Sequence, residues 1–185
     1  MAPRIPPKAV ADLDDETRQL ITKTLQSPDG EPLNIFRTLS HHPAVLRRFM
    51  SFGTELLLKG ALPARERELL ILRTGWNTQS EYEWGQHVAI GRMVGLTDVE
   101  LARVKAGPDA DGWSEADAAL LRAADELHAG STITGDTWST LVKAYPDEQS
   151  QIEIVMIVGY YHLVAFFLNT TGVEREQGVV GLDSP

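Results

Sequence analysis

Apolar residues recur at intervals of three and four positions along most of the chain, and this spacing predicts α-helices throughout. The pattern is clear between residues 34 and 60, where the His42–Pro43 step divides the segment into two helices. Further helices are predicted to start near residues 63, 80, 97, 114, 134 and 147. No alternation of apolar and polar residues is long enough to predict a β-strand. We therefore predict an all-α, helix-bundle fold.

The two ends of the chain differ from this helical middle. Residues 1–11 are rich in proline and predict an irregular arm. The first helix is expected from Asp12, where acidic side chains would favour the positive end of the helix dipole. Residues 175–185 form a polar tail that contains glycine. No linker divides the 185 residues, so we predict one all-α domain spanning residues 1–185.

Two of the predicted helices begin with the same local pattern, a hydroxyl residue followed three positions later by glutamate. Ser80 and Glu83 form one such pair, and Thr97 and Glu100 form the other. In a capping box, the hydroxyl accepts from one backbone N–H of the first turn and the glutamate accepts from another. We predict a capping box at both positions.

The helix that begins at Ser80 carries the chain's densest cluster of groups capable of proton chemistry. Glu83 and His87 are four residues apart, so they share one face of a helix. Glu68 belongs to the preceding apolar helix, which a short polar turn folds back onto this one. A neighbouring carboxylate can shift a histidine pKa across neutral pH, so this trio predicts general acid/base chemistry.

Composition removes several classes of function. The formal net charge is −9 and the pI is near 5.0, which argues against a nucleic-acid or anionic membrane surface. The chain has no cysteine, which excludes disulfides, thiolate metal sites and cysteine nucleophiles. No apolar run approaches the roughly 18–20 residues of a membrane span, and the N-terminus lacks the apolar core of a signal peptide. We expect a cytoplasmic protein without membrane or nucleic-acid partners.

Several segments resemble the carboxymuconolactone decarboxylase and alkylhydroperoxidase-D superfamily. They are RERELLILR (65–73), SEYEWGQH (80–87), GLTDVEL (95–101), DAALLRAADELH (117–128), TWSTL (137–141) and YHLVAFFLNTTGV (161–173). Together they cover most of residues 33–175. In the peroxidase branch, a glutamate precedes two cysteines and a histidine at a fixed spacing. This chain has Glu68, Ser80, Glu83 and His87 at those positions, so it is similar to a cysteine-free branch.

The resemblance implies a helical bundle that assembles as a trimer or hexamer, with a dimer also open. It further implies a site near a subunit interface that needs no metal or organic cofactor. Because Ser80 and Glu83 cannot form a disulfide or a sulfenic acid, we expect no thiol peroxidase activity. Decarboxylation of a carboxylated lactone needs no thiol, only a positioned acid/base and a group that stabilises the enolate.

The leading hypothesis is a cofactor-free enzyme of the carboxymuconolactone decarboxylase-like type, a lyase that acts on a small organic acid or lactone. His87 would act as general acid/base, Glu83 would orient it or share its proton, and Glu68 would tune the pair. Arg73 or Arg92 would hold an anionic substrate. No set of His, Asp and Glu has convincing metal spacing.

Further candidates for binding the substrate come from the same helix and from the last one. Ser80 and Trp84 flank the central motif, whereas Tyr161, His162 and Asn169 are polar groups inside an apolar helix and need partners if buried. Each also has a structural interpretation, as a core, capping or interface residue. His128 is expected to bond the carbonyl groups at its helix end.

Three alternatives stay open at this point. The chain could be a non-enzymatic homo-oligomer that binds a small ligand in the same pocket. It could retain peroxide chemistry that does not use cysteine. Alternatively, Glu68, Glu83 and His87 could be a buried polar network that only fixes helix packing.

Overall fold

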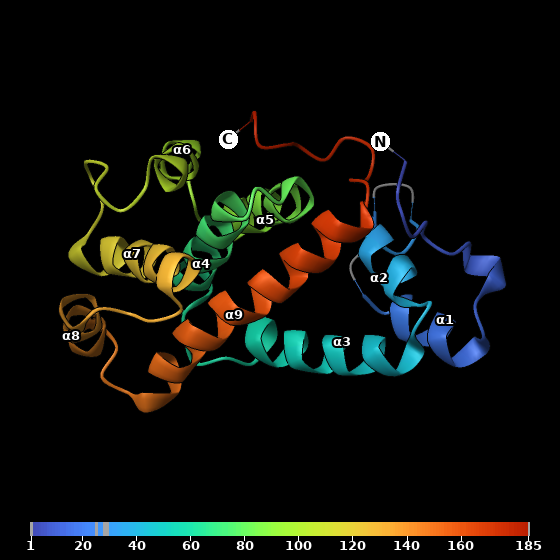
Figure 1. Cartoon of the computed structure of the whole chain (residues 1–185), viewed down its shortest axis with the longest axis horizontal. Coiled ribbons are helices and arrows are strands. Elements are labelled where there is room, and N and C mark those ends of the chain that lie inside the picture. The colour runs from blue at the N-terminus through green and yellow to red at the C-terminus, as the bar shows by residue number, and fades with distance from the viewer. Residues whose placement is uncertain (1, 25, 28–29, 185) are drawn as a thin grey trace.

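The structure, a computed structural model, describes residues 2–24, 26–27 and 30–184. Within those residues the chain forms α-helices and no β-strand, so the all-α prediction is confirmed (Figure 1). The helices are α1 (Asp15–Ile21), α2 (Asn34–Leu39), α3 (Pro43–Leu58), α4 (Ala64–Asn77), α5 (Glu81–Met93), α6 (Asp98–Ala106), α7 (Glu115–Gly130), α8 (Gly135–Ala144) and α9 (Glu148–Thr171).

Most helix boundaries lie where the sequence predicted them, because local capping chemistry determines where they start. Pro43 opens α3, and the side chains of Thr97, Ser114 and Asp147 accept backbone N–H groups at the starts of α6, α7 and α9. The first helix is an exception. It begins at Asp15 rather than at Asp12, because Asp14 caps it and the preceding residues form the 3₁₀ turn η1 (Val10–Asp12).

Helix α4 is the centre of the core and packs against α5, α7 and α9. Its residues 68–72 are buried all round, which is expected of a helix surrounded by others. In Figure 1, α9 crosses the molecule diagonally, with α3 along one side and α4 and α5 along the other. The short α2 packs against α3. This arrangement encloses the space between α2, α3, α5 and α9 where the candidate site lies.

Helix α9 corrects one expectation from the sequence. By length and composition alone it could cross a membrane, since its most apolar window has a mean hydropathy of 1.7. In this fold, 44% of that window is buried inside the protein. The buried part of α9 packs against α3, α4, α5 and α7, whereas other apolar side chains of this helix stay exposed.

The segment after α9 folds back along α5 instead of forming a detached polar tail (Figure 1). The Lys105 amino group donates to the carbonyl oxygens of Leu182 and Ser184, both at 2.9 Å. The Trp84 indole N–H also donates to the Ser184 carbonyl oxygen, at 3.1 Å. A Cβ added to Gly85 would clash with the carbonyl oxygen of Val180, so the close approach of the two segments requires glycine there.

Candidate functional site

The hairpin of α4 and α5 brings Glu68 and His87 into direct contact. The Nδ1 atom of His87 lies 2.7 Å from Oε2 of Glu68, and both residues are buried. Two other arginines of α4 pair elsewhere: Arg65 bonds Glu100 and Asp117, and Arg73 bonds Asp125. Glu68 therefore orients the imidazole ring and leaves Nε2 of His87 as the ring nitrogen available to a ligand.

Glu83 lies one helical turn before His87 on α5, yet its carboxyl group makes no hydrogen bond. It is 2% exposed, and neither carboxyl oxygen has a partner among the described residues. Burial raises the pKa of Glu83 well above its ordinary value, and the charge of Glu68 adds to the effect. A neutral carboxyl group is a hydrogen-bond donor as well as an acceptor, so Glu83 is equipped to give a proton.

The predicted capping box at Ser80 and Glu83 is wrong. Ser80 is the N-cap residue of α5, but its side chain caps no backbone N–H and its buried hydroxyl has no partner among the described residues. A backbone bond from the Ser80 N–H to the Gly75 carbonyl oxygen, at 2.9 Å, connects the two helices instead. Glu83 therefore does not turn back toward the helix start.

Tyr161 from α9 completes the group around His87. Its ring meets the imidazole edge-on, with centroids 4.9 Å apart. Burial, followed by the charges of Glu68 and Glu83, raises the pKa of Tyr161 well above its ordinary value. The side chain is therefore a neutral phenol that fixes one side of the imidazole ring by packing.

A cavity of about 570 Å³ opens beside these groups. Glu68, Glu83, His87 and Tyr161 all line it. Most of the remaining wall is apolar and comes from α2, α3, α5 and α9. The cavity thus joins an apolar chamber to an acid, a carboxylate and an imidazole, which is the arrangement needed to transfer protons to and from a bound small molecule.

Four other side chains that the sequence singled out do not line this cavity. Ser80 and Trp84 are fully buried, and Trp84 packs against Trp76 and the C-terminal segment. The Nε2 atom of His162 forms a hydrogen bond with Nδ1 of His128, at 2.9 Å. His128 therefore contacts the His162 ring rather than the carbonyl groups at its helix end, which the sequence predicts as its partners. Asn169 donates to the Thr78 carbonyl oxygen at 2.9 Å.

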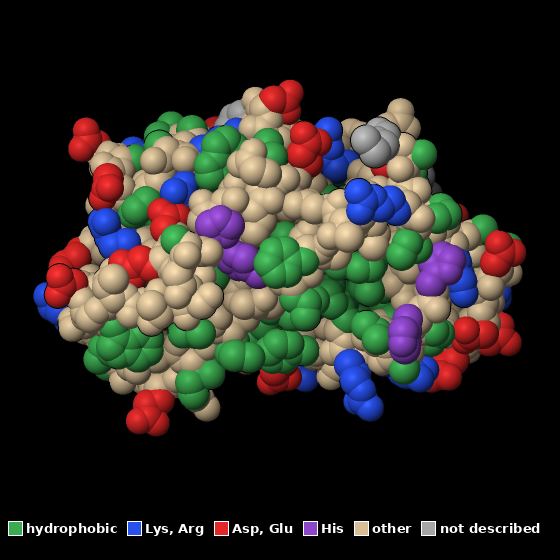
Figure 2. All heavy atoms as spheres, viewed as in Figure 1, with side chains coloured by type: hydrophobic (Ala, Val, Ile, Leu, Met, Phe, Trp, Pro, Cys, Tyr) green, Lys and Arg blue, Asp and Glu red, His purple; other side chains and the backbone are tan. Residues whose placement is uncertain are grey.

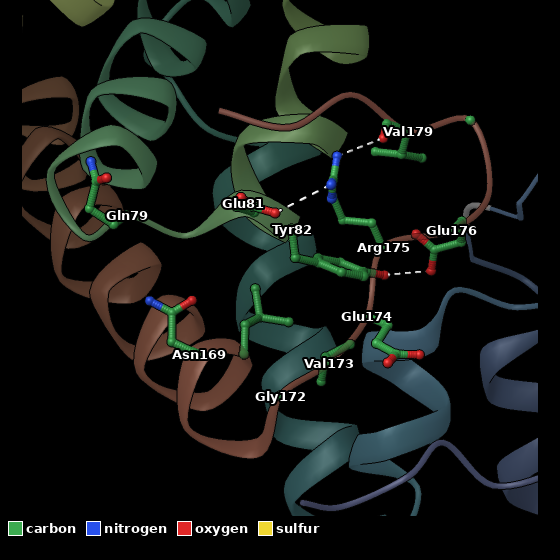
Figure 3. A pocket seen from close by; sticks show the side chains of 12 residues that line it. Gln79, Glu81, Tyr82, Asn169, Gly172, Val173, Glu174, Arg175, Glu176 and Val179 are labelled. Carbon is green, nitrogen blue, oxygen red and sulfur yellow. Dashed lines mark hydrogen bonds and ion pairs between the residues drawn. The ribbon is translucent and has the colours of Figure 1, made fainter. Parts of the chain in front are cut away.

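Asn169 also lines a second, shallower hollow between α5, the end of α9 and the C-terminal segment (Figure 3). Here Glu176 accepts from the Tyr82 hydroxyl at 2.7 Å and from the Gln86 amide. Arg175 reaches Glu81 at 3.3 Å and the Val179 carbonyl oxygen at 3.0 Å. These contacts tie the segment to α5, so the hollow is a seam between packed elements.

The predicted anion-binding arginines also lie away from the cavity. Arg73 is bound to Asp125 and to the backbone of α6, and Arg92 pairs with Asp98. Arg67, to which the sequence analysis gave no role, lines the cavity, and its buried Nε has no partner among the described residues. The only signal in the sequence was that Arg67 is adjacent to Glu68.

A metal centre finds no support in this arrangement of side chains. Across the described ranges, no group of three or more His, Asp or Glu residues is placed to hold a metal ion.

Comparisons with known proteins find similarity both in sequence and in fold. Residues 43–126 match the model of the carboxymuconolactone decarboxylase family. A peroxidase-related protein with an alkylhydroperoxidase AhpD core from Ralstonia eutropha JMP134 superposes with a TM-score of 0.82 at 26% identity, covering 95% of this chain and 93% of that one. No curated protein sequence matches the chain.

Two further solved structures share the fold at lower identity. A peroxidase-related protein from Silicibacter sp. TM1040 has a TM-score of 0.82 at 16% identity, covering 97% of this chain and 96% of that one. The debrominase Bmp8 has a TM-score of 0.79 at 14% identity, covering 94% and 92%. The chain thus resembles the carboxymuconolactone decarboxylase family over residues 43–126, shares the AhpD-like fold and has no cysteine.

Proposed function

We propose that the protein is an acid/base enzyme that moves protons next to a carbonyl group of a small molecule bound in the cavity. One observation carries the proposal. Glu83 is buried with no hydrogen-bond partner among the described residues, and it lines the same cavity as the hydrogen-bonded Glu68–His87 pair. A buried carboxyl group without a partner costs stability, and a ligand that accepts its proton would satisfy it.

The roles follow from the contacts. With Glu68 accepting from Nδ1, Nε2 of His87 is the base that takes a proton from the carbon next to the carbonyl group. Glu83 gives its proton to the carbonyl oxygen, so the product of this step is an enol. Return of the proton from His87 to the same or another carbon, and recovery of the Glu83 proton, completes the cycle.

This reaction class includes the lyase chemistry of lactones and small organic acids that the family resemblance suggests. It uses no thiol, and we expect no cysteine-dependent peroxidase activity from a chain without cysteine. A thiol-coupled peroxide assay that reads at the buffer rate would agree with this expectation.

The direct test follows exchange of hydrogen for deuterium at the α-carbon of a bound ketone or lactone in D₂O, measured by NMR. We expect exchange faster than in buffer, and loss of that exchange in His87→Gln with an intact fold by circular dichroism. Ligands that bind without any exchange would contradict the acid/base role. Such ligands would still raise the melting temperature, because they bind the folded state. A raised melting temperature without exchange would favour the ligand-binding alternative.

We also propose that the protein assembles with copies of itself. Support comes from an exposed apolar strip along α9, which runs at helical spacing and consists of Ile152, Val155, Met156, Leu163 and Phe166. Figure 2 shows hydrophobic side chains gathered on this face of the molecule, over α9 and α3. Sedimentation equilibrium should report an oligomer for the natural chain and a smaller species for Phe166→Lys.

A further inference from the structure

The chemical character of the cavity changes along its length. The chamber is lined by aliphatic and aromatic side chains of α2, α3 and α9, including Leu33, Phe36, Phe49, Leu57 and Leu168. Two large apolar side chains that also line it, Leu58 and Met93, are 80% and 75% exposed and therefore form an apolar rim. A ligand would remove much apolar surface from water on entering, so its body has to be apolar.

The polar end holds two groups that a ligand can satisfy. Within the part of the chain that the structure describes, the buried Nε–H of Arg67 has no partner, while its Nη1 donates to the Leu62 carbonyl oxygen at 3.3 Å. The neutral carboxyl group of Glu83 offers a second donor. Two single donors suit one oxygen atom with two lone pairs, as in a ketone, lactone or amide carbonyl.

The same end is unfavourable for an anion. Glu68 is already a buried acid, and its charge adds to burial in raising the pKa of Glu83. A ligand carboxylate placed beside these two acids would meet the same repulsion. The formal charges of Arg67 and Glu68 cancel, and Lys23, which also lines the cavity, is exposed to solvent, where its charge is screened. The two arginines predicted to bind an anion, Arg73 and Arg92, lie outside the cavity.

We infer that the ligand is an uncharged, mostly apolar molecule whose carbonyl oxygen accepts hydrogen bonds from Arg67 and Glu83. The inference rests on the proposed acid/base function and narrows it. The favoured reaction is a proton shift at the carbon next to an uncharged carbonyl group, rather than loss of CO₂ from a carboxylate. In that shift His87 takes the α-proton, Glu83 protonates the oxygen, and both protons are returned, so no oxidant or reductant is required.

Three probes of one shape test the ligand class: 4-phenyl-2-butanone, 3-phenylpropanamide and 3-phenylpropanoate. They share the phenylethyl body and differ only in carrying a methyl ketone, an amide or, at neutral pH, a carboxylate. Calorimetric titration of the natural full-length chain at pH 7 should show the ketone and the amide binding at least about tenfold more tightly than the carboxylate.

Two variants locate the binding. Arg67→Met should weaken the ketone and the amide about tenfold, because it removes one donor and keeps a side chain of similar length. Arg92→Met makes the same change of charge outside the cavity and should leave all three affinities unchanged. Circular dichroism and melting curves verify that both variants are folded.

Equal or tighter binding of the carboxylate, or binding of none of the three probes, would overturn the inference. The proposed function fails in a different way. If the ketone binds but gains no deuterium at its α-carbon, the inference of an uncharged carbonyl ligand is supported and the proposed acid/base function is contradicted. If an anion is turned over while the ketone does not bind, the ligand class alone falls.

Discussion

The turns that start α5 and α6 carry the same sequence pattern, but only the glutamate of α6 bonds back to its own helix start. At α6, Glu100 accepts from the Thr97 backbone N–H at 2.9 Å, and Thr97 accepts from the Glu100 N–H at 3.2 Å, which closes a capping box. At α5, the Ser80 side chain caps no backbone N–H, and Glu83 lies in the cavity wall with no hydrogen-bond partner among the described residues.

The pKa values of the two carboxyl groups are consequently shifted in opposite directions from the ordinary glutamate value. Burial acts to raise the pKa of Glu100, but hydrogen bonds from Arg65 and Thr97 outweigh it and lower the pKa. At Glu83 nothing opposes burial and the charge of Glu68, so the pKa rises. Burying the Glu83 carboxyl group without a local partner lowers the free energy of unfolding. Such a loss of stability is expected where a residue serves function rather than folding.

The largest difference between the two glutamates is expected in the rate of α-proton exchange. Glu83→Gln keeps the shape of the side chain but removes the transferable proton, so we expect α-proton exchange to fall by about 10²–10⁴-fold. Glu100→Gln, the matched change at the other turn, should leave exchange unchanged. The NMR exchange assay compares both variants, and equal rates for Glu83→Gln and the natural chain would remove Glu83 from the mechanism.

The Glu68–His87 pair can be separated from a purely structural network by single and double replacement. His87→Leu leaves the buried carboxylate of Glu68 without its partner, and we expect a loss of about 3–5 kcal/mol in unfolding free energy. Adding Glu68→Leu should recover most of that loss, because a matched apolar pair replaces a matched polar one. Denaturant unfolding measures both variants.

The rate of α-proton exchange distinguishes a catalytic role of the Glu68–His87 pair from a role in packing alone. The double variant should remain without exchange even though it is stable. A stable double variant that still exchanges the α-proton would show that the pair only supports packing. In that case the site would have to be sought elsewhere in the cavity wall.

The pH dependence of stability should distinguish Glu83 from Glu100 by sign. Because the folded-state pKa of Glu83 is raised, the unfolded chain ionises first as pH increases above the ordinary glutamate value near 4.5. The unfolded state then binds fewer protons, so this residue makes stability fall with rising pH until the folded-state pKa is reached. Glu100, with a lowered pKa, contributes stability that is lost as pH falls.

Glu83→Gln should therefore be more stable than the natural chain at neutral pH and about equal to it near pH 4. The gain should grow by up to about 1.4 kcal/mol per pH unit across the window. Denaturant unfolding between pH 4 and 8 measures it. A difference between the two chains that stays constant with pH would mean that Glu83 is ionised in the folded protein.

The sequence predicted the helices well, because their starts depend on residues close to one another in the chain. The His42–Pro43 break and the capping box at Thr97 are examples. It also predicted that Glu68, Glu83 and His87 would lie together, since that requires only one helix face and one tight turn. These are contacts over short separations.

The contacts that the sequence did not reveal connect residues far apart in the chain. Trp84 reaches Ser184, and His128 meets His162. Arg67 became a cavity residue only through the way α2, α3 and α9 close around it. Periodicity indicates which side of a helix is buried, but not which neighbour buries it.

The smallest expected effect compares the two hydroxyl groups themselves. Thr97→Ala removes a hydroxyl that accepts from the Glu100 N–H and donates to its carboxylate at 2.8 Å, so we expect a loss of about 1 kcal/mol in unfolding free energy. Ser80→Ala removes a buried hydroxyl that has no partner among the described residues, and should be neutral or stabilising by up to about 1 kcal/mol. Paired melting curves measure both. If Ser80→Ala costs as much as Thr97→Ala, Ser80 caps α5 in solution, Glu83 is drawn back toward the helix start, and the contrast between the two turns disappears.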